Sequence, residues 1–291
     1  MLKGLAVIPA RGGSKGIFRK NMRLLNGKPL IHYSLNTAQQ CNYIVDIVVT
    51  SDDEQILSYV SRYGVTVRHR PSDLAADDVP LDPVIKDALD YVVSTKNQSY
   101  DFVVTLQPTS PLLSIHTLNC AIEEFSSRSV DTLLSVVDDS CLTWNEVGSE
   151  IVPGYKERLN RQWLPKRYRE TGAFLITRPQ YVCSQSRFGK SVSVFVMPEH
   201  EGIDVDSVTD WLISDALIRR LHYAFVVNGS SSVGFGHIYR SLVLADTLLG
   251  HEVSFYACDS DEAAIDLIRR RGYQCNIIDE VEIPKVIARS D

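Results

Sequence analysis

Short apolar runs recur along the first two thirds of the chain, separated by segments in which apolar residues have helical spacing. The run at residues 44–53 (IVDIVVTSDD), which ends in acids, is continuously rather than alternately apolar. Continuous hydrophobicity is typical of parallel strands covered on both faces. Strands that alternate with helices predict an α/β fold with a doubly wound, mostly parallel sheet. The predicted strands span residues 5–8, 44–53, 65–67, 102–106, 132–137, 169–177 and 192–197.

Capping and turn residues indicate where the intervening helices begin. Pro29 suits the first turn of one helix, and Ser114 is expected to cap another. Asp82 occupies an N-cap position directly before Pro83, which would be the first helical residue. Two more helices are predicted at residues 56–63 and 208–221, the second of them amphipathic.

The pattern changes in two places. Between residues 138 and 168 the periodicity weakens and predicts no regular element. At residue 222 a new series starts, and the chain reaches Asp291 after one β-α-β-α-β unit, which is short for a nucleotide-binding domain. We therefore predict two domains, residues 1–221 and a C-terminal partial α/β unit at 222–291. The elements expected in the second are strands at 223–228 and 253–257 and helices at 241–249 and 263–271.

The loop after the first strand, residues 8–21 (IPARGGSKGIFRKN), combines three glycines with four cationic side chains. Glycine lets the backbone approach a ligand closely, and successive free N–H groups form an anion-binding concavity. A solvated basic turn is the plain alternative, but such turns seldom follow a buried strand with this density of glycine. We interpret this opening loop as a polyphosphate site. Its cations are Arg11, Lys15, Arg19 and Lys20.

The two common phosphate motifs do not fit this loop. GxxxxGK[ST] is missing, and the glycines fall as GGxxG rather than as the GxGxxG of dinucleotide-binding folds. The acids after the second strand, Asp52 and Asp53, also lie too far along the chain for the ribose-binding acid of that fingerprint.

Charge and composition exclude other classes. The net charge of −6 argues against a general nucleic-acid binder, which would carry a basic face. The six cysteines include no CxxC pair, so neither a zinc site nor a disulfide framework is indicated, and reduced thiols fit a cytoplasmic protein. No apolar run approaches the roughly 20 residues that span a membrane.

Asp204 and Asp206 form a candidate metal site. In extended chain, side chains two residues apart point the same way. Two carboxylates with open positions suit Mg²⁺ shared with substrate phosphates. Paired acids at a strand end are usually just solvated, so the pair gains weight only together with the opening loop.

Several long motifs, taken in order, resemble those of the CMP-sialic acid synthetases (acylneuraminate cytidylyltransferases) over residues 4–221. They are the opening loop, NGKPLI, VVTSDD, RPSDLA, LQPTSPL, NRQWLP…RETGAF and DVDSVTDW. The resemblance implies a Rossmann-like (GT-A) nucleotidyltransferase fold. It also implies transfer of CMP from CTP to the anomeric hydroxyl of a nonulosonic acid, a nine-carbon 2-keto acid sugar such as sialic, legionaminic or pseudaminic acid, with release of pyrophosphate. Family members are homodimers, in which the irregular segment would reach the neighbour's site.

The resemblance assigns roles to individual positions. Catalysis would rest on Lys20 and Arg11 together with Asp204 and Asp206, which would hold Mg²⁺. Nucleotide binding falls on Arg11, Gly12, Gly13, Ser14, Lys15, Asn21 and Arg70. Sugar binding falls on Gln107, Arg161, Arg169 and Gly172.

Some positions depart from the family pattern. Phe18 stands where proline is usual in the opening loop, and Pro80-Leu81 replaces two serines near the base and ribose. Leu113 replaces an arginine after QPTSPL, and Thr171 replaces the asparagine before Gly172. Nucleotide binding is expected to be intact, and the departures concern the identity of the sugar.

Two alternatives remain. One is another sugar nucleotidyltransferase, such as a 3-deoxy-octulosonate cytidylyltransferase, which Lys15-Gly16 and the motifs around Gln107 and Arg161 disfavour. The other is an inactive nucleotide-binding scaffold, against which the intact acidic pair and Lys20 count.

The segment GFGHIYRSLVLADTL resembles the start of the UDP-sugar hydrolases of nonulosonate biosynthesis, which share the GT-B fold. In that family the histidine of the glycine loop is catalytic, and His237 occupies its position. Because only residues 222–291 are covered, we predict that His237 is not catalytic in this chain.

Overall fold

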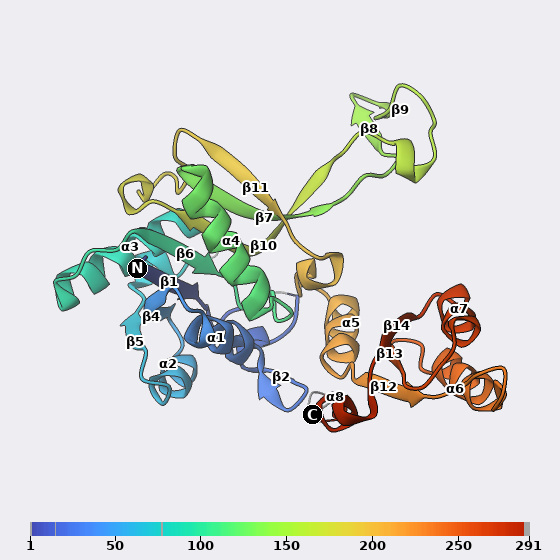
Figure 1. Ribbon diagram of the computed structural model, residues 1–291. Helices are drawn as coiled ribbons and strands as arrows, with labels where there is room; N and C mark the ends of the chain where they lie inside the picture. Colours follow the sequence, from blue (N-terminus) through green and yellow to red (C-terminus); the bar gives the residue numbers. More distant parts are fainter. Residues whose placement is uncertain (1, 15, 77, 288–291) are drawn as a thin grey trace. The chain divides into compact units, whose positions relative to one another are not determined.

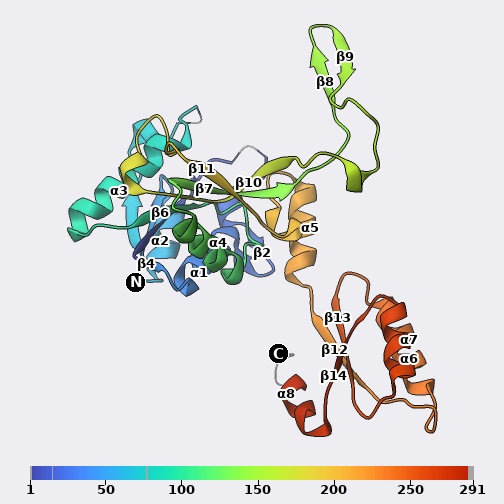
Figure 2. The same ribbon diagram turned by 45° about the horizontal axis from the view of Figure 1, so that its top comes forward.

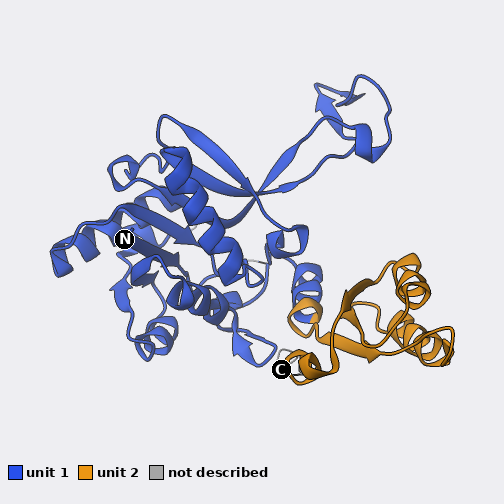
Figure 3. Cartoon of the chain, in the orientation of Figure 1, with its two compact units in different colours: residues 1–215 blue, residues 216–291 orange. Residues whose placement is uncertain are grey.

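The computed structural model describes residues 2–14, 16–76 and 78–287. The chain divides into two compact units, Met1–Asp215 and Ala216–Asp291 (Figure 3). The division falls inside one helix, six residues before the boundary expected from the sequence. No helix in the described part of the chain is long and apolar enough to cross a membrane.

Unit 1 is built on a seven-stranded sheet with the order β11-β7-β10-β6-β1-β4-β5 (Figure 1). β10 is antiparallel to its neighbours β6 and β7, whereas the other pairings are parallel. The expected doubly wound, mostly parallel sheet is therefore confirmed. Its strands are β1 (Gly4–Pro9), β4 (Ile44–Ser51), β5 (Thr66–His69), β6 (Phe102–Leu106), β7 (Thr132–Asp138), β10 (Tyr168–Thr177) and β11 (Val192–Val196).

Helices cover both faces of this sheet, which explains the continuous apolar runs. Alternate residues of β1 enter different cores: Ala6 and Ile8 join one, and Leu5 and Val7 join the other. All four side chains are fully buried. The first core is covered by α1 (Leu30–Gln40), α2 (Glu54–Ser61) and α4 (Ile115–Arg128), and the second by α3 (Leu81–Lys96).

Two of the predicted helix starts can be checked against the hydrogen bonds of their caps. Ser114 caps α4, since its hydroxyl oxygen accepts a hydrogen bond from the Thr117 amide. The prediction for Asp82 is wrong. Helix α3 begins at Leu81, before Asp82, and Pro80 is its N-cap. The Asp82 carboxylate instead accepts a hydrogen bond from Arg187 Nε at 2.5 Å.

The segment without periodicity, residues 138–168, extends away from the sheet as an arm (Figure 2). It contains a short antiparallel hairpin of β8 (Trp144–Val147) and β9 (Glu150–Pro153). Trp144, Ile151 and Trp163 of this arm are exposed. A smaller hairpin, β2 (Leu24–Leu25) with β3 (Lys28–Pro29), turns at Asn26-Gly27, where both residues have positive φ.

Helix α5 (Val208–Ile218) contains the boundary between the units. Of its eleven residues, all described, Ser214 alone is buried. The amphipathic interpretation is wrong, because apolar residues such as Val208, Leu212 and Ile213 are exposed rather than gathered on a buried face.

Unit 2 has a parallel sheet of order β12-β13-β14 with the predicted β-α-β-α-β sequence of elements. Helix α6 begins five residues earlier than expected. The elements of this unit are β12 (His222–Val227), α6 (Gly236–Thr247), β13 (Glu252–Ala257), α7 (Glu262–Arg270), β14 (Gln274–Ile277) and α8 (Ile283–Ile287). Short 3-10 turns in the chain are η1 (Lys20–Met22), η2 (Ser72–Leu74), η3 (Arg161–Trp163), η4 (Pro179–Tyr181), η5 (Glu199–Gly202) and η6 (Glu280–Glu282).

Candidate active site

A cavity of about 610 Å³ opens beyond the carboxyl ends of β1, β5 and β6. Ligands of open α/β sheets bind at this edge, where loops from neighbouring strands meet. The cavity brings together most of the residues predicted to bind the nucleotide and the metal, with one of those predicted to bind the sugar. They are Arg11, Ser14, Lys20, Asn21, Arg70, Gln107, Asp204 and Asp206. Lys15 lies outside the described residues.

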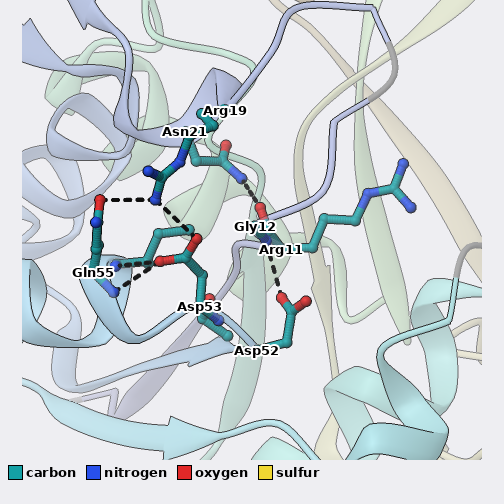
Figure 4. A network of polar contacts seen from close by, with 9 residues as sticks. Arg11, Gly12, Arg19, Asn21, Asp52, Asp53 and Gln55 are labelled. Atoms are coloured by element: carbon teal, nitrogen blue, oxygen red, sulfur yellow. Dashed lines mark hydrogen bonds and ion pairs between the residues drawn. The ribbon is translucent and has the colours of Figure 1, made fainter.

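The two acids that follow β4 support the start of the opening loop. The Gly12 amide donates a hydrogen bond to Asp52 Oδ1 at 2.9 Å, and Asn21 Nδ2 donates to the Arg11 carbonyl oxygen at 2.8 Å. The side chain of Arg11 extends away from these contacts (Figure 4). Since Asp52 occupies the Gly12 amide, the amides of Gly13 and Ser14 remain the candidates for binding phosphate.

Asp53 explains why glycine is required at position 12. A Cβ at Gly12 would lie 2.8 Å from Asp53 Cβ, which is closer than side chains can pack. Asp53 is the N-cap of α2, and its side chain accepts hydrogen bonds from the amides of Gln55 and Ile56. Arg19 donates to Asp53 Oδ2 at 3.2 Å and to Gln55 Oε1 at 2.7 Å (Figure 4). Arg19, one of the four loop cations, therefore fixes the loop to α2.

The end of the opening loop packs against the acidic pair. Lys20 Nζ donates to the Val205 carbonyl oxygen at 2.7 Å and to Asp206 Oδ1 at 2.8 Å. Gly16 is equally constrained, because a Cβ there would lie 2.4 Å from the Asp206 carbonyl oxygen. The opening loop and the segment 203–206, which lie far apart in the sequence, are thus in direct contact.

Asp204 has an environment suited to a cation. Its Oδ1 is buried and has no hydrogen-bond partner in the described part of the chain. Burial raises the pKa of Asp204 and the Asp206 carboxylate acts in the same direction, whereas the Thr109 side chain and Lys20 oppose this effect. The described residues contain no group of three or more His, Cys, Asp or Glu side chains placed to hold a metal. Mg²⁺ often takes only one or two carboxylates besides phosphate and water, so this pair fits it.

Arg70 also lines the cavity. Its guanidinium is buried and donates from Nη2 to the Thr50 carbonyl oxygen at 3.0 Å, while no partner of Nε is found among the described residues. Burial lowers the pKa of Arg70, and Asp52 opposes this effect. The wall beside it is apolar and suits the face of a flat base. It consists of Leu74, Ala76, Val79, Pro80, Leu81 and Val84.

Gln107 and Gly172 are neighbours across β6 and β10. Gly172 has a φ of +71°, and a Cβ there would lie 3.0 Å from Gln107 Nε2. Thr171 is buried, and its hydroxyl donates to Ser135 Oγ at 2.8 Å. Leu113 is also buried. The positions that carry asparagine and arginine in the family pattern therefore present no polar side chain to the cavity.

The other predicted sugar ligands, Arg161 and Arg169, line a second cavity of about 460 Å³ at the base of the arm. Within one chain they are therefore not brought together with Gln107. Sequence reasoning missed Lys166, which pairs with Asp138 near Arg161 and lowers the pKa of that aspartate. Its only signal in the sequence was a cation in an irregular segment.

A family profile described as "Cytidylyltransferase" matches residues 5–178. The chain belongs to the cytidylyltransferase family. The match covers the strands that form the cavity, and it ends before the acidic pair.

Three curated relatives of this cytidylyltransferase are named for different acid sugars. Pseudaminic acid cytidylyltransferase of Campylobacter jejuni is 32% identical over 76% of this chain and 98% of its own. CMP-N,N′-diacetyllegionaminic acid synthase of Legionella pneumophila is 30% identical over 76% of this chain and 99% of its own. N-acylneuraminate cytidylyltransferase A of Danio rerio is 24% identical over 97% of this chain and 67% of its own.

Solved structures share the fold of this cytidylyltransferase. A CMP:2-keto-3-deoxy-manno-octonic acid synthetase complexed with CTP has a TM-score of 0.54 and 16% identity, covering 74% of this chain and 98% of its own. A 4-diphosphocytidyl-2C-methyl-D-erythritol synthase has a TM-score of 0.56 and 11% identity, covering 75% and 99%.

Proposed function

We propose that this cytidylyltransferase transfers CMP from CTP to the anomeric hydroxyl of a nonulosonic acid and releases pyrophosphate. The observation that supports this proposal most strongly is that one cavity at the carboxyl edge of the sheet is lined by two cations and two carboxylates. They are Arg11, Lys20, Asp204 and Asp206. Relatives named for pseudaminic, legionaminic and N-acylneuraminic acids support the sugar class.

In the proposed reaction, the anomeric oxygen of the sugar attacks the α-phosphorus of CTP. The new oxygen–phosphorus bond forms while the bond to the bridging oxygen breaks, and pyrophosphate leaves with that electron pair as the hydroxyl proton is released. Arg11 and Lys20 offset the negative charge of the phosphates. The amides of Gly13 and Ser14 bind phosphate oxygens, and Lys15 is expected to join them.

Arg70 and Asn21 belong to the nucleotide end of the site. In the proposal Arg70 faces the base beside the apolar wall, and Asn21 keeps the backbone of Arg11 in place. Gln107 and the closely packed Gly172 bind the sugar. Mg²⁺ held by Asp204 and Asp206 would offset phosphate charge and favour departure of pyrophosphate.

A pyrophosphate-release assay with CTP tests this function. The acceptors are pseudaminic, legionaminic, N-acetylneuraminic and 3-deoxy-octulosonic acids. We expect turnover with at least one nine-carbon acid sugar, with a CMP-sugar detected by mass spectrometry. Turnover with the eight-carbon acid alone would favour the 3-deoxy-octulosonate alternative, and no turnover with any acceptor would favour the scaffold.

We further propose a homodimer in which Arg161 and Arg169 complete the neighbour's site. Supporting observations are that both arginines lie in a cavity apart from Gln107 and that the arm exposes Trp144 and Trp163. The carboxylate of an acid sugar would pair with such an arginine through two parallel hydrogen bonds.

Arg161→Ala is expected to lose sugar affinity, with a rate loss on the order of 10²-fold, because a pre-organised charged contact is removed. CTP binding measured by calorimetry should barely change. Mixing Arg161→Ala with Gln107→Ala should restore part of the activity if the two residues come from different chains. An equal loss of CTP affinity, or no recovery on mixing despite subunit exchange, would contradict this arrangement.

A cytoplasmic location is also proposed. All six cysteines are free thiols, as reducing compartments favour. Fractionation of cells expressing the natural gene would test it, and recovery of the protein outside the cytoplasmic fraction would contradict it.

A further inference from the structure

Glu201 is a buried carboxylate three residues before Asp204. It is 6% exposed and lies in η5 (Glu199–Gly202). Its Oε2 accepts a hydrogen bond from the Ser114 amide at 2.9 Å, and its Oε1 accepts one from Thr117 Oγ1 at 3.0 Å. The donors lie at the N-cap and in the first turn of α4, where the helix dipole also favours a negative charge. Glu201 therefore links the segment before the acidic pair to α4, a helix that packs against the sheet.

The rest of this segment packs tightly but carries fewer side-chain contacts. At Gly202 a Cβ would lie 2.3 Å from Val137 Cγ1, so the backbone runs directly against β7. The Val205 amide donates to the Thr109 carbonyl oxygen at 2.8 Å. Lys20 is the contact from the opening loop. Glu201 is the anchor on the α4 side, and it comes before both carboxylates in the chain.

Asp204 needs such an anchor. Its Oδ1 is buried, so the folded protein must hold a partly desolvated carboxylate in place. No hydrogen-bond partner of this oxygen is found among the described residues, so the backbone on either side helps to set the position of the carboxylate.

We propose that Glu201 is a positioning residue, which holds the segment 202–206 against α4 so that Asp204 and Asp206 face the cavity. The consequence for catalysis rests on the function proposed above, whereas the mechanical link between Glu201 and the segment does not. The two parts can therefore fail separately.

Four variants test the link. Glu201→Ala removes both acceptors, and Thr117→Val removes one donor with little change in shape. Glu201→Gln can keep both contacts, because its amide oxygen can accept from Ser114 and its amide nitrogen can donate to Thr117. Asp131→Ala is the matched control: its carboxylate accepts hydrogen bonds from the amides of Lys190 and Ser191 just before the start of β7, whereas Gly202 contacts Val137 near the end of that strand.

Two readouts report on the segment without turnover. The first is hydrogen exchange of the Val205 amide, and the second is Mn²⁺ affinity measured by electron paramagnetic resonance with CTP present. In Glu201→Ala we expect faster Val205 exchange and weaker Mn²⁺ binding, each by about 10-fold or more, as loss of hydrogen bonds to a charged group implies. Thr117→Val should show smaller changes in the same direction, and Glu201→Gln should stay near wild type.

The control separates positioning from general stability. Asp131→Ala should lower the thermal midpoint and leave both readouts unchanged. The proposal is overturned if Glu201→Ala or, should that variant not fold, Thr117→Val leaves Val205 exchange unchanged. It is also overturned if Asp131→Ala reproduces the effect, or if Glu201→Gln is as defective as Glu201→Ala. Absence of Mn²⁺ binding in the wild type, with the exchange results as expected, would contradict the proposed function and leave the link standing.

Discussion

The two units offer a comparison, because in each a parallel strand leads into a glycine-rich loop. In unit 1 the loop carries cations, and Asp52 and Asp53 hold it from the next strand. In unit 2 the loop 228–236 has no lysine or arginine. It closes on itself through a bridge between Ser230 and Gly234.

The aspartates that contact the two loops also differ in the groups to which they bind. Asp261 of unit 2 accepts hydrogen bonds from the amide and hydroxyl of Ser231, and these contacts lower its pKa. It thus satisfies loop donors that could otherwise have met an anion. His237 is exposed and pairs with Asn228 Oδ1 at 3.3 Å. The small cavity between α6 and α7, about 260 Å³, is not lined by His237. We therefore expect phosphate to bind at the loop of unit 1, which has cations and outside support, and not at the loop of unit 2.

The largest expected effect is that of Asp204→Asn in unit 1. Losing this carboxylate should reduce pyrophosphate release on the order of 10²-fold or more. Because burial raises the pKa of Asp204, the neutral amide should leave the thermal midpoint unchanged or higher. Steady-state rates over a range of Mg²⁺ concentrations, with circular dichroism as a check on folding, measure this. Full turnover by Asp204→Asn at limiting Mg²⁺ would contradict the proposed role of Asp204 in holding the metal.

A matched pair of glycine substitutions tests the comparison directly. In Gly12→Ala the new methyl would meet Asp53, so the loop must shift, at a cost of about 1–3 kcal/mol for an overpacked position, with loss of CTP affinity. In Gly236→Ala the nearest atom is Arg240 Nη1 at 4.0 Å, and alanine should stabilise the protein by about 0.4–1 kcal/mol because it restricts the unfolded chain. Calorimetry with CTP measures the affinity of each variant, and thermal unfolding measures its stability. Equal CTP affinities in the two variants would refute the role of the close packing at Gly12.

The smallest expected effect is that of His237→Ala. We expect unchanged CMP transfer and no UDP-sugar hydrolysis by either protein, because the loop of unit 2 offers no cation to a diphosphate. Incubation with a UDP-acetamido sugar, followed by chromatography of UDP, checks this. UDP release by the wild type that disappears in the variant would show that unit 2 has its own activity.

The sequence predicted those features that depend on neighbouring residues. Strands β1 and β6 followed from their apolar runs, because burial on both faces leaves no room for alternation. The Ser114 cap was equally predictable, since its partner Thr117 is three residues away. The opening loop was found from its own glycines and cations.

Features decided by distant residues could not be predicted. Asp82 was expected to cap α3, but Arg187, 105 residues further along, binds it instead. The structural use of Arg19 depends on Asp53, and the role proposed for Glu201 depends on α4. The arm was missed for another reason: β8 and β9 are short and largely exposed, so burial imposes no pattern on their sequence.

A crystal structure of the chain with CTP and Mg²⁺ tests the central claim most directly. We predict the triphosphate over residues 11–20, the base beside Arg70, and one metal ion bound by Asp204 and Asp206. Electron density for CTP at the loop 228–236 of unit 2, or a metal ion bound away from both carboxylates, would contradict this account.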